Sequence, residues 1–248
     1  MLHNLTSAAP ISGLNLQLQG RLVACSELGG VEIQSMFDLL SRNFMGVIPE
    51  VFLRDLEEKN WVILIEDQEG KLRGFTTFLM VQSQVTKMPT TVVSSGDTIV
   101  DPLAWGSPIL PRTWIRSIYE LKQNFPEGDL VWLLLTSGFR TYRFMSVFCR
   151  EFFPRFDRDS PEEIQNLLRA LAKEKYAKTF DAESGLVRFP KPQALRDHLI
   201  HIPEGRKTDP HIEFFLRSNP GHAKGDELVS LAFLSLDNLT SAGKRMVR

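Results

Sequence analysis

The chain has 248 residues, of which 43% are apolar and 24% charged, and its formal net charge is −1 at pH 7. This length can bury a large core, and the balanced charge argues against a nucleic-acid surface. No apolar run approaches the roughly 18 residues that a membrane span needs, and no charged-then-apolar secretory pattern opens the chain. We therefore expect a cytoplasmic protein without a membrane span.

A change in the period of the apolar residues separates the first expected strands from the first expected helix. Residues 1–13 are small and polar, which predicts a flexible arm before an α/β domain that covers 14–248. Period-two alternation predicts a strand over 14–20, and 21–26 is either its continuation or a second strand. From residue 31 the spacing becomes helical, and a short helix is expected over 50–59.

A hairpin and a βαβα unit follow. Two apolar runs, 61–65 and 72–81, flank a turn at 67–70 and predict an antiparallel hairpin. A strand over 90–100, a loop over 101–112, a helix capped by Thr113, a buried strand over 130–136 and a helix over 139–153 come next. Parallel pairing of the two strands would place a ligand outside their carboxyl ends, at 101–112 and 137–143.

The last third of the chain is more polar. Ser160 and Pro161 open a helix, a second helix is expected near 193–201, and a last one over 239–247. Apolar runs at 211–216 and 227–236 predict two strands. We expect one domain whose C-terminal elaboration begins near 157, and a split into two domains near 156 is the alternative.

This order of elements resembles the GNAT fold of the acyl-CoA N-acyltransferase superfamily. The residues that carry the resemblance are the hairpin that ends in Gly74-Phe75 and the strand end Val100-Asp101-Pro102. The resemblance covers roughly 20–155, with 211–236 as a final strand pair. It implies an α/β fold with a mixed, centrally splayed sheet flanked by helices, and here with extra C-terminal helices.

Two departures from the family pattern bear on function. The family's pyrophosphate-binding glycines fall near Pro108 and Leu110, and Pro108 and Pro111 lack the backbone N–H groups that would hold the phosphates. The tyrosine that serves as general acid in many members corresponds to Phe148. The resemblance therefore implies acyl-CoA as co-substrate, with an acyl-carrier-protein thioester as the variant, and no tightly bound cofactor.

The candidate site residues come from the strand ends. Asp97 is the candidate general base, and its alternative is a strand-end cap. The expected donor-binding residues are Trp105, Gly106, Ser107, Arg112 and Thr113. The expected substrate-binding residues are Ser137, Arg140, Tyr142 and Arg143. Each of these segments has a structural alternative, as a packed loop or as a solvated basic helix face.

Other reactive residues favour structural roles. His198 and His201 have metal-compatible spacing but no third ligand, so we expect no metal site. Cys25 and Cys149 form no framework, and we expect both to be reduced and buried. The aromatic stripe Phe144, Phe148, Phe152 and Phe153 is either core or the wall of an acyl-chain pocket.

These expectations combine into one functional hypothesis. The protein would move an acyl group from a CoA or acyl-carrier-protein thioester to a small-molecule amine or amino acid. The alternative is a non-catalytic ligand-binding or interaction module on the same fold, which the missing glycines and tyrosine favour.

Overall fold

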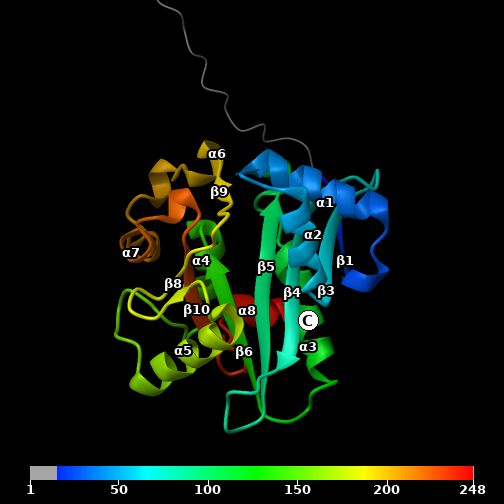
Figure 1. Ribbon diagram of the computed structural model, residues 1–248. Helices are drawn as coiled ribbons and strands as arrows, with labels where there is room; N and C mark the ends of the chain where they lie inside the picture. Colours follow the sequence, from blue (N-terminus) through cyan, green and yellow to red (C-terminus); the bar gives the residue numbers. More distant parts are fainter. Residues whose placement is uncertain (1–15, 248) are drawn as a thin grey trace, which may run out of the picture.

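The computed structural model describes residues 16–247, so the expected arm at 1–13 lies outside the described residues. Its centre is a mixed sheet with the strand order β1-β3-β4-β5-β6-β10-β8-β7 (Figure 1). These strands are β1 (Leu18–Ala24), β3 (Trp61–Asp67), β4 (Leu72–Gln82), β5 (Thr90–Val100), β6 (Asp129–Thr136), β10 (Glu227–Phe233), β8 (Leu186–Val187) and β7 (Phe180–Asp181). A separate pair joins β2 (Phe44–Met45) to β9 (Ala194–Leu195).

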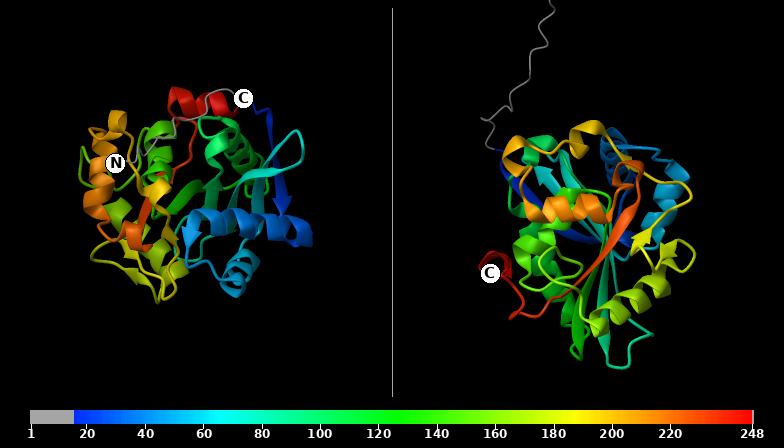
Figure 2. Two further views of the ribbon diagram at one scale, coloured as in Figure 1. Left: turned by 90° about the horizontal axis from the view of Figure 1, so that it is seen from above. Right: turned by 90° about the vertical axis from the view of Figure 1, so that its left-hand side faces the viewer.

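Helices cover both faces of the sheet. They are α1 (Gly30–Asn43), α2 (Pro49–Glu57), α3 (Ile109–Lys122), α4 (Phe139–Phe148), α5 (Glu162–Tyr176), α6 (Asp197–Ile200), α7 (Pro210–Ser218) and α8 (Ser241–Val247). Seen from above, α1, α2 and α5 lie on one side, and α3 and α8 on the other (Figure 2). Within 16–247, every helix is too short or too polar for a bilayer crossing.

The strand pairing confirms the expected sheet. β5 and β6 run parallel, from Thr90 opposite Asp129 to Ser94 opposite Leu133, which are the N-terminal parts of both strands. All other pairs in the sheet are antiparallel, including the hairpin of β3 and β4. The protein is thus an α/β fold with a mixed sheet, and the one parallel pair among residues 16–247 is joined by a helical crossover through α3.

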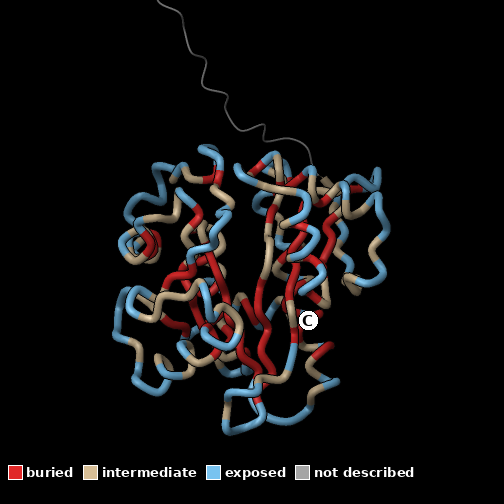
Figure 3. Tube along the Cα trace, in the orientation of Figure 1, coloured by how far each residue is buried: buried red, intermediate tan, exposed pale blue. Residues whose placement is uncertain are grey.

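The core consists of apolar layers on the two faces of the sheet. Ile63 and Trp132 belong to the layer against α3 and α4, whereas Leu64 packs under α1 and α2 and Leu133 under α5. Adjacent residues thus serve opposite layers, as the pleat of a strand requires. Figure 3 shows that much of the central strands is buried. Each fully buried side chain of this size contributes about 1.5–3 kcal/mol.

A bulge interrupts this alternation on β5. Thr76 pairs with Thr98 and Phe78 with Ser95, so two residues of β5 lie opposite the single intervening residue of β4. The extra residue reverses the side-chain alternation: Val93 packs in the layer against α3, but Ile99 packs under α1 and α2. Such a bulge re-aims the side chains that follow it.

The structure corrects the expected strand at 211–216, which is helix α7. Pro210 occupies its first turn, and the Asp209 carboxylate accepts a hydrogen bond from the His211 N–H at 3.0 Å. Ile212 and Phe215, three residues apart, are its buried side chains. The Asp-Pro helix start was the local signal that the apolar run obscured.

Other boundaries also differ from the expected ones. Only one strand, β1, lies within the described part of 14–26, and β10 ends before 236. The helix expected over 139–153 ends at Phe148, because Thr240, Asn238 and Leu231 hold the following chain by backbone hydrogen bonds.

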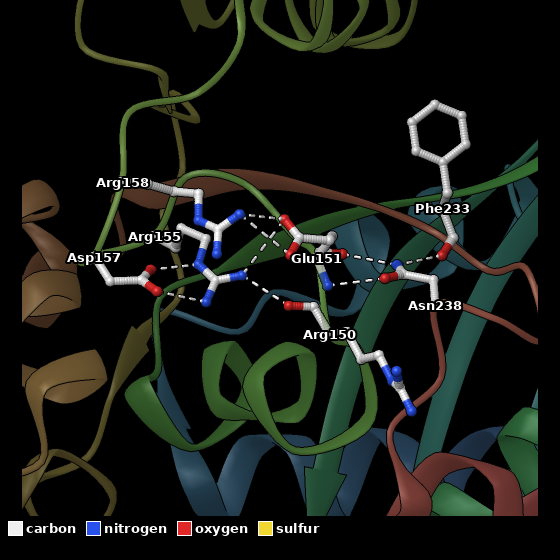
Figure 4. Close-up of polar contacts among 7 residues, drawn as sticks. All are labelled: Arg150, Glu151, Arg155, Asp157, Arg158, Phe233 and Asn238. Carbon is white, nitrogen blue, oxygen red and sulfur yellow. Dashed lines mark hydrogen bonds and ion pairs between the residues drawn. The ribbon is translucent and has the colours of Figure 1, made fainter.

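An arginine network fastens the connection between α4 and α5 (Figure 4). Arg155 donates to both carboxylate oxygens of Asp157 and to the Arg150 carbonyl oxygen, the last at 2.7 Å. The Asn238 amide donates to the carbonyl oxygens of Glu151 and Phe233, at 2.8 Å each. These bonds connect the segment after α4 to the end of β10, and so they fix the position of this segment relative to the sheet.

Candidate active site

The candidate site is a cleft between β5 and β6. Their ladder stops at Ser94 and Leu133, and the two strands diverge beyond it (Figure 1). A cavity of about 1420 Å³ fills the region; Ser95, Gly96, Asp97 and Thr98 line one wall, and Leu135, Thr136, Ser137 and Gly138 the other. The facing backbone edges of the two strands have no ladder partners here, so they are available to an extended ligand.

The donor-side residues expected from the loop after β5 line this cavity. Trp105, Gly106 and Ser107 all lie on its wall. The Trp105 indole N–H donates to the Val100 carbonyl oxygen at 3.0 Å, which holds the ring against the strand end. Gly106 has a φ of +87°, a backbone conformation that glycine adopts without strain.

Arg140 joins the two strand-end segments. Its guanidinium lies 4.7 Å from the Trp105 ring centroid and 4.6 Å from that of Phe139. It donates to the carbonyl oxygens of Leu199 and His201, and burial lowers its pKa. The expected proximity of 101–112 and 137–143 is therefore present, but the Arg140 donors are engaged by the protein itself.

Arg112 and Thr113 lie away from the cavity wall, because α3 starts earlier than expected. The helix begins at Ile109, so Thr113 is an interior helical residue and not a cap. Thr113 packs directly over Gly20 of β1, where no room remains for a Cβ. Pro111 occupies the third helical position, where its missing N–H breaks no helical bond.

The expected substrate-binding residues divide in the same way. Ser137 and Arg143 line the cavity, and the Arg143 Nε lies 2.9 Å from the Asp209 carboxylate. Tyr142 is fully buried, and its hydroxyl donates to the Pro154 carbonyl oxygen at 2.9 Å. Tyr142 therefore belongs to the core behind the cleft and does not line the cavity.

Asp97 lies on the wall that faces α2. The bulge turns its side chain to this face, which Ile99, two residues later, also faces. A Cβ added at the preceding Gly96 would lie 2.6 Å from Lys59 Cε, so the lysine runs beside this strand. Lys59 Nζ binds Asp55 Oδ1 at 2.6 Å. Burial raises the pKa of Asp97 to about 7; the Asp55 carboxylate adds to this rise and Lys59 opposes it. Such a carboxylate can take a proton near neutral pH.

A second carboxylate, Glu227, was missed by the sequence analysis. It opens β10, lines the same cavity and projects to the same face of the sheet as Val229, under α5. Burial raises its pKa to about 8, with further rises from Asp97 and Asp55. The only local signal was a charged residue at the start of an apolar strand.

Lys175 and Tyr176, at the end of α5, complete this polar wall and were also missed. Burial lowers the pKa of Lys175 to about 8, and Lys59 contributes to the shift. Burial and the nearby Glu227 raise the pKa of Tyr176. Helical periodicity gives no indication that these residues meet a strand 50 positions later.

The remaining candidates have structural or boundary roles. Of the aromatic stripe, Phe144 and Phe148 line the cavity, whereas Phe152 and Phe153 are buried in the core. His198 is hydrogen-bonded to Asn43 at 3.0 Å, and the described residues contain no cluster of His, Cys, Asp and Glu that would hold a metal. Both cysteines are free, and burial raises the pKa of Cys149 to about 12, which leaves it a poor nucleophile.

No protein-family model and no curated protein matches this sequence. Among solved structures, the chain is similar to a GNAT family N-acetyltransferase from Escherichia coli in complex with CoA, with 18% identity and a TM-score of 0.38 over 54% of this chain and 67% of that one. It is similar to a probable N-acyltransferase from Enterococcus faecalis V583, with 14% identity and a TM-score of 0.41 over 66% of this chain and 45% of that one. It is also similar to an acyl-CoA N-acyltransferase from Pseudomonas aeruginosa, with 13% identity and a TM-score of 0.37 over 53% of this chain and 88% of that one. At this level of similarity, the function of this chain has to be argued from its own cleft.

Proposed function

We propose that this protein transfers an acyl group from a thioester to an amine bound in the cleft between β5 and β6. The observation that carries the proposal is the cavity of about 1420 Å³ at the point where the parallel ladder ends, with Asp97 on its wall. An extended thioester arm fits a gap between strand edges, because such edges offer unpaired N–H and C=O groups.

The donor would lie against the strand ends. Trp105, Gly106 and Ser107 would contact it on the β5 side, and Ser137 on the β6 side, since all four line the cavity. Phe144 and Phe148 would flank the acyl group with apolar surface. Backbone N–H groups beyond the ladder would polarise the thioester carbonyl as negative charge develops on its oxygen.

Asp97 would act as the general base. The amine nitrogen attacks the thioester carbonyl carbon, Asp97 accepts the proton that the nitrogen loses, and the carbon–sulfur bond breaks to release a thiolate. The raised pKa of Asp97 suits this role, because the carboxylate is poised near neutral pH. No tyrosine is invoked for the leaving thiolate, because Phe148 holds the position where the family resemblance implies one.

The two prolines bear on the choice of donor. Pro108 precedes α3 and Pro111 lies in its first turn, so the turn after β5 offers fewer N–H groups to a pyrophosphate. The same feature favours an acyl-carrier-protein thioester, or the alternative of a non-catalytic binding module. Free CoA, acetyl-CoA and acetylated acyl carrier protein therefore need to be compared directly.

The test combines binding with turnover. Thermal shift with the three donors reports binding, and thiol release in the presence of a mixed panel of primary amines reports transfer. Transfer that is abolished by Asp97→Asn, with donor binding retained, is the expected result. Donor binding without thiol release for any amine would favour the binding module, and no binding of any donor would remove the acyltransferase hypothesis.

A further inference from the structure

Four lysines line the cleft: Lys178 and Lys191 are exposed, whereas Lys59 is buried and Lys175 partly buried, in contrasting situations. Lys59 is neutralised: its Nζ binds the carboxylate of Asp55 at 2.6 Å and the Asp55 carbonyl oxygen at 3.0 Å, and its side chain is 3% exposed. Lys175 is partly buried in the same cavity, but within 16–247 it forms no hydrogen bond and no ion pair. Its Nζ lies 5.7 Å from the centroid of the Tyr176 ring.

Lys175 is thus partly removed from water and has no anionic partner among residues 16–247. Removing an ammonium from water is unfavourable unless an anion or several acceptors replace the solvent. The carboxylates of Asp55 and Glu58 influence Lys175, yet burial and Lys59 outweigh them and lower its pKa. The protein therefore presents a cation to the cavity without supplying its partner.

Two carboxylates line the same cavity. Asp97 comes from β5 and Glu227 from β10, and both face the side of the sheet that α2 and α5 cover. Lys59 runs beside Gly96, which precedes Asp97, and it also influences Lys175, so it is close to both. An acceptor in this cavity therefore has carboxylates and a lysine ammonium group on its walls.

We propose that the acceptor is a bipolar molecule, a primary amine that also carries a carboxylate or phosphate, whose anionic group is bound by Lys175. This inference rests on the proposed function and specifies its acceptor. The amine would lie at Asp97 and Glu227, where its proton is removed. The anionic group would form a charge-assisted hydrogen bond with Lys175 Nζ and so place the nitrogen at the thioester.

The experiment uses pairs of amines that differ only in the anionic group. Phenylalanine is compared with phenethylamine, and phosphoethanolamine with ethanolamine, as acceptors for acetyl-CoA and acetylated acyl carrier protein. Thiol release gives kcat and KM, and thermal shift gives binding of the same compounds without turnover. We expect the anionic member of at least one pair to be preferred by about tenfold or more in kcat/KM, the effect of one charge-assisted hydrogen bond.

Variants of α5 then identify the residue. Lys175→Met should remove the preference mainly by raising KM for the anionic member, and Lys175→Arg should restore most of it. Lys173→Met is the matched control, since Lys173 is exposed on the same helix and does not line the cavity. Equal use of both members in every pair, or a preference that survives Lys175→Met, would overturn the inference but leave the acyltransferase intact.

Thermal shift separates the two hypotheses when turnover fails. If no amine releases thiol, the proposed function falls, and a stabilisation by the anionic members that Lys175→Met abolishes would still support the anion site. If the anionic and uncharged members stabilise the protein equally, the anion site is also wrong.

Discussion

The Trp132 indole N–H donates a 2.8 Å hydrogen bond to Ser95 Oγ, which joins a residue of the β6 ladder to the first residue of β5 beyond it. Both residues are buried. This bond closes the floor of the cleft, since the strands are held together below it and diverge above it. The position of the cleft therefore depends on one side-chain contact as well as on the backbone ladder.

Removing the Ser95 hydroxyl should destabilise the protein. Ser95→Ala leaves the buried indole N–H without a partner, which costs about 1–3 kcal/mol, and urea denaturation measures the loss. Ser230→Ala is the matched control, because the Ser230 hydroxyl is buried on β10 without a hydrogen-bond partner. Equal destabilisation by the two variants would show that the bond to Trp132 contributes nothing specific.

Activity should depend on the ionisation of Asp97. Because the pKa of Asp97 is raised to about 7, thiol release should increase as the pH rises through about 7 and level off above it. Asp55→Asn removes a carboxylate that raises this pKa, so the acid limb of the profile should move to lower pH. A pH–rate profile of kcat/KM checks both statements, and an unchanged limb in Asp55→Asn would argue against Asp97 as the base.

Ionisation of Asp97, which should increase activity as the pH rises, should at the same time lower the stability of the fold. A carboxyl group whose pKa is raised by folding binds its proton more tightly in the folded state, so stability is lost as the pH rises from the unfolded pKa toward about 7. Asp97→Asn has no carboxyl group to ionise at this position and so avoids this loss of stability. The Tm of the variant should exceed that of the wild type by a few degrees at pH 8 but match it at pH 4. A lower Tm than the wild type at pH 8 would contradict the burial of a charged Asp97.

Free CoA should bind weakly. Pro108 and Pro111 remove N–H donors from the turn that leads into α3, and Arg140 is engaged by backbone carbonyls. Calorimetry should give a Kd well above the low micromolar range, and Pro111→Ala should tighten it by restoring one donor in the first helical turn. A low micromolar Kd for the wild-type protein would mean that the remaining donors suffice.

Arg155 should be the energetic centre of the network that follows α4. Its side chain is 11% exposed, so Arg155→Ala leaves the Arg150 carbonyl and the Asp157 carboxylate without their donor and should cost about 1–3 kcal/mol. Arg158→Ala is the control: that side chain is 52% exposed, and its pair with Glu151 should contribute about 0–1 kcal/mol. Chemical denaturation of the two variants measures the difference.

Several features of this protein follow from the sequence alone. The apolar runs and the breaks around them placed β5, β6 and the crossover helix, and one helical crossover implied the parallel pair that the structure contains. Because parallel strands carry ligands at their carboxyl ends, the segments 101–112 and 137–143 were expected to lie together, and Trp105 and Ser137 line one cavity. These features depend on local periodicity and on chain connectivity, which a sequence expresses directly.

The composition of the site was decided by the tertiary structure. The bulge opposite Thr77 reverses the alternation of β5, and this depends on its register with β4. Glu227 and Lys175 line the same cavity as Asp97 because β10 joins β6 and α5 covers the same face of the sheet. Arg140 and Tyr142 are engaged by carbonyl oxygens of Leu199 and Pro154, so their donors serve the fold. Each outcome depends on a partner remote in sequence, and hydrophobic periodicity carries no information about which remote segment a side chain will meet.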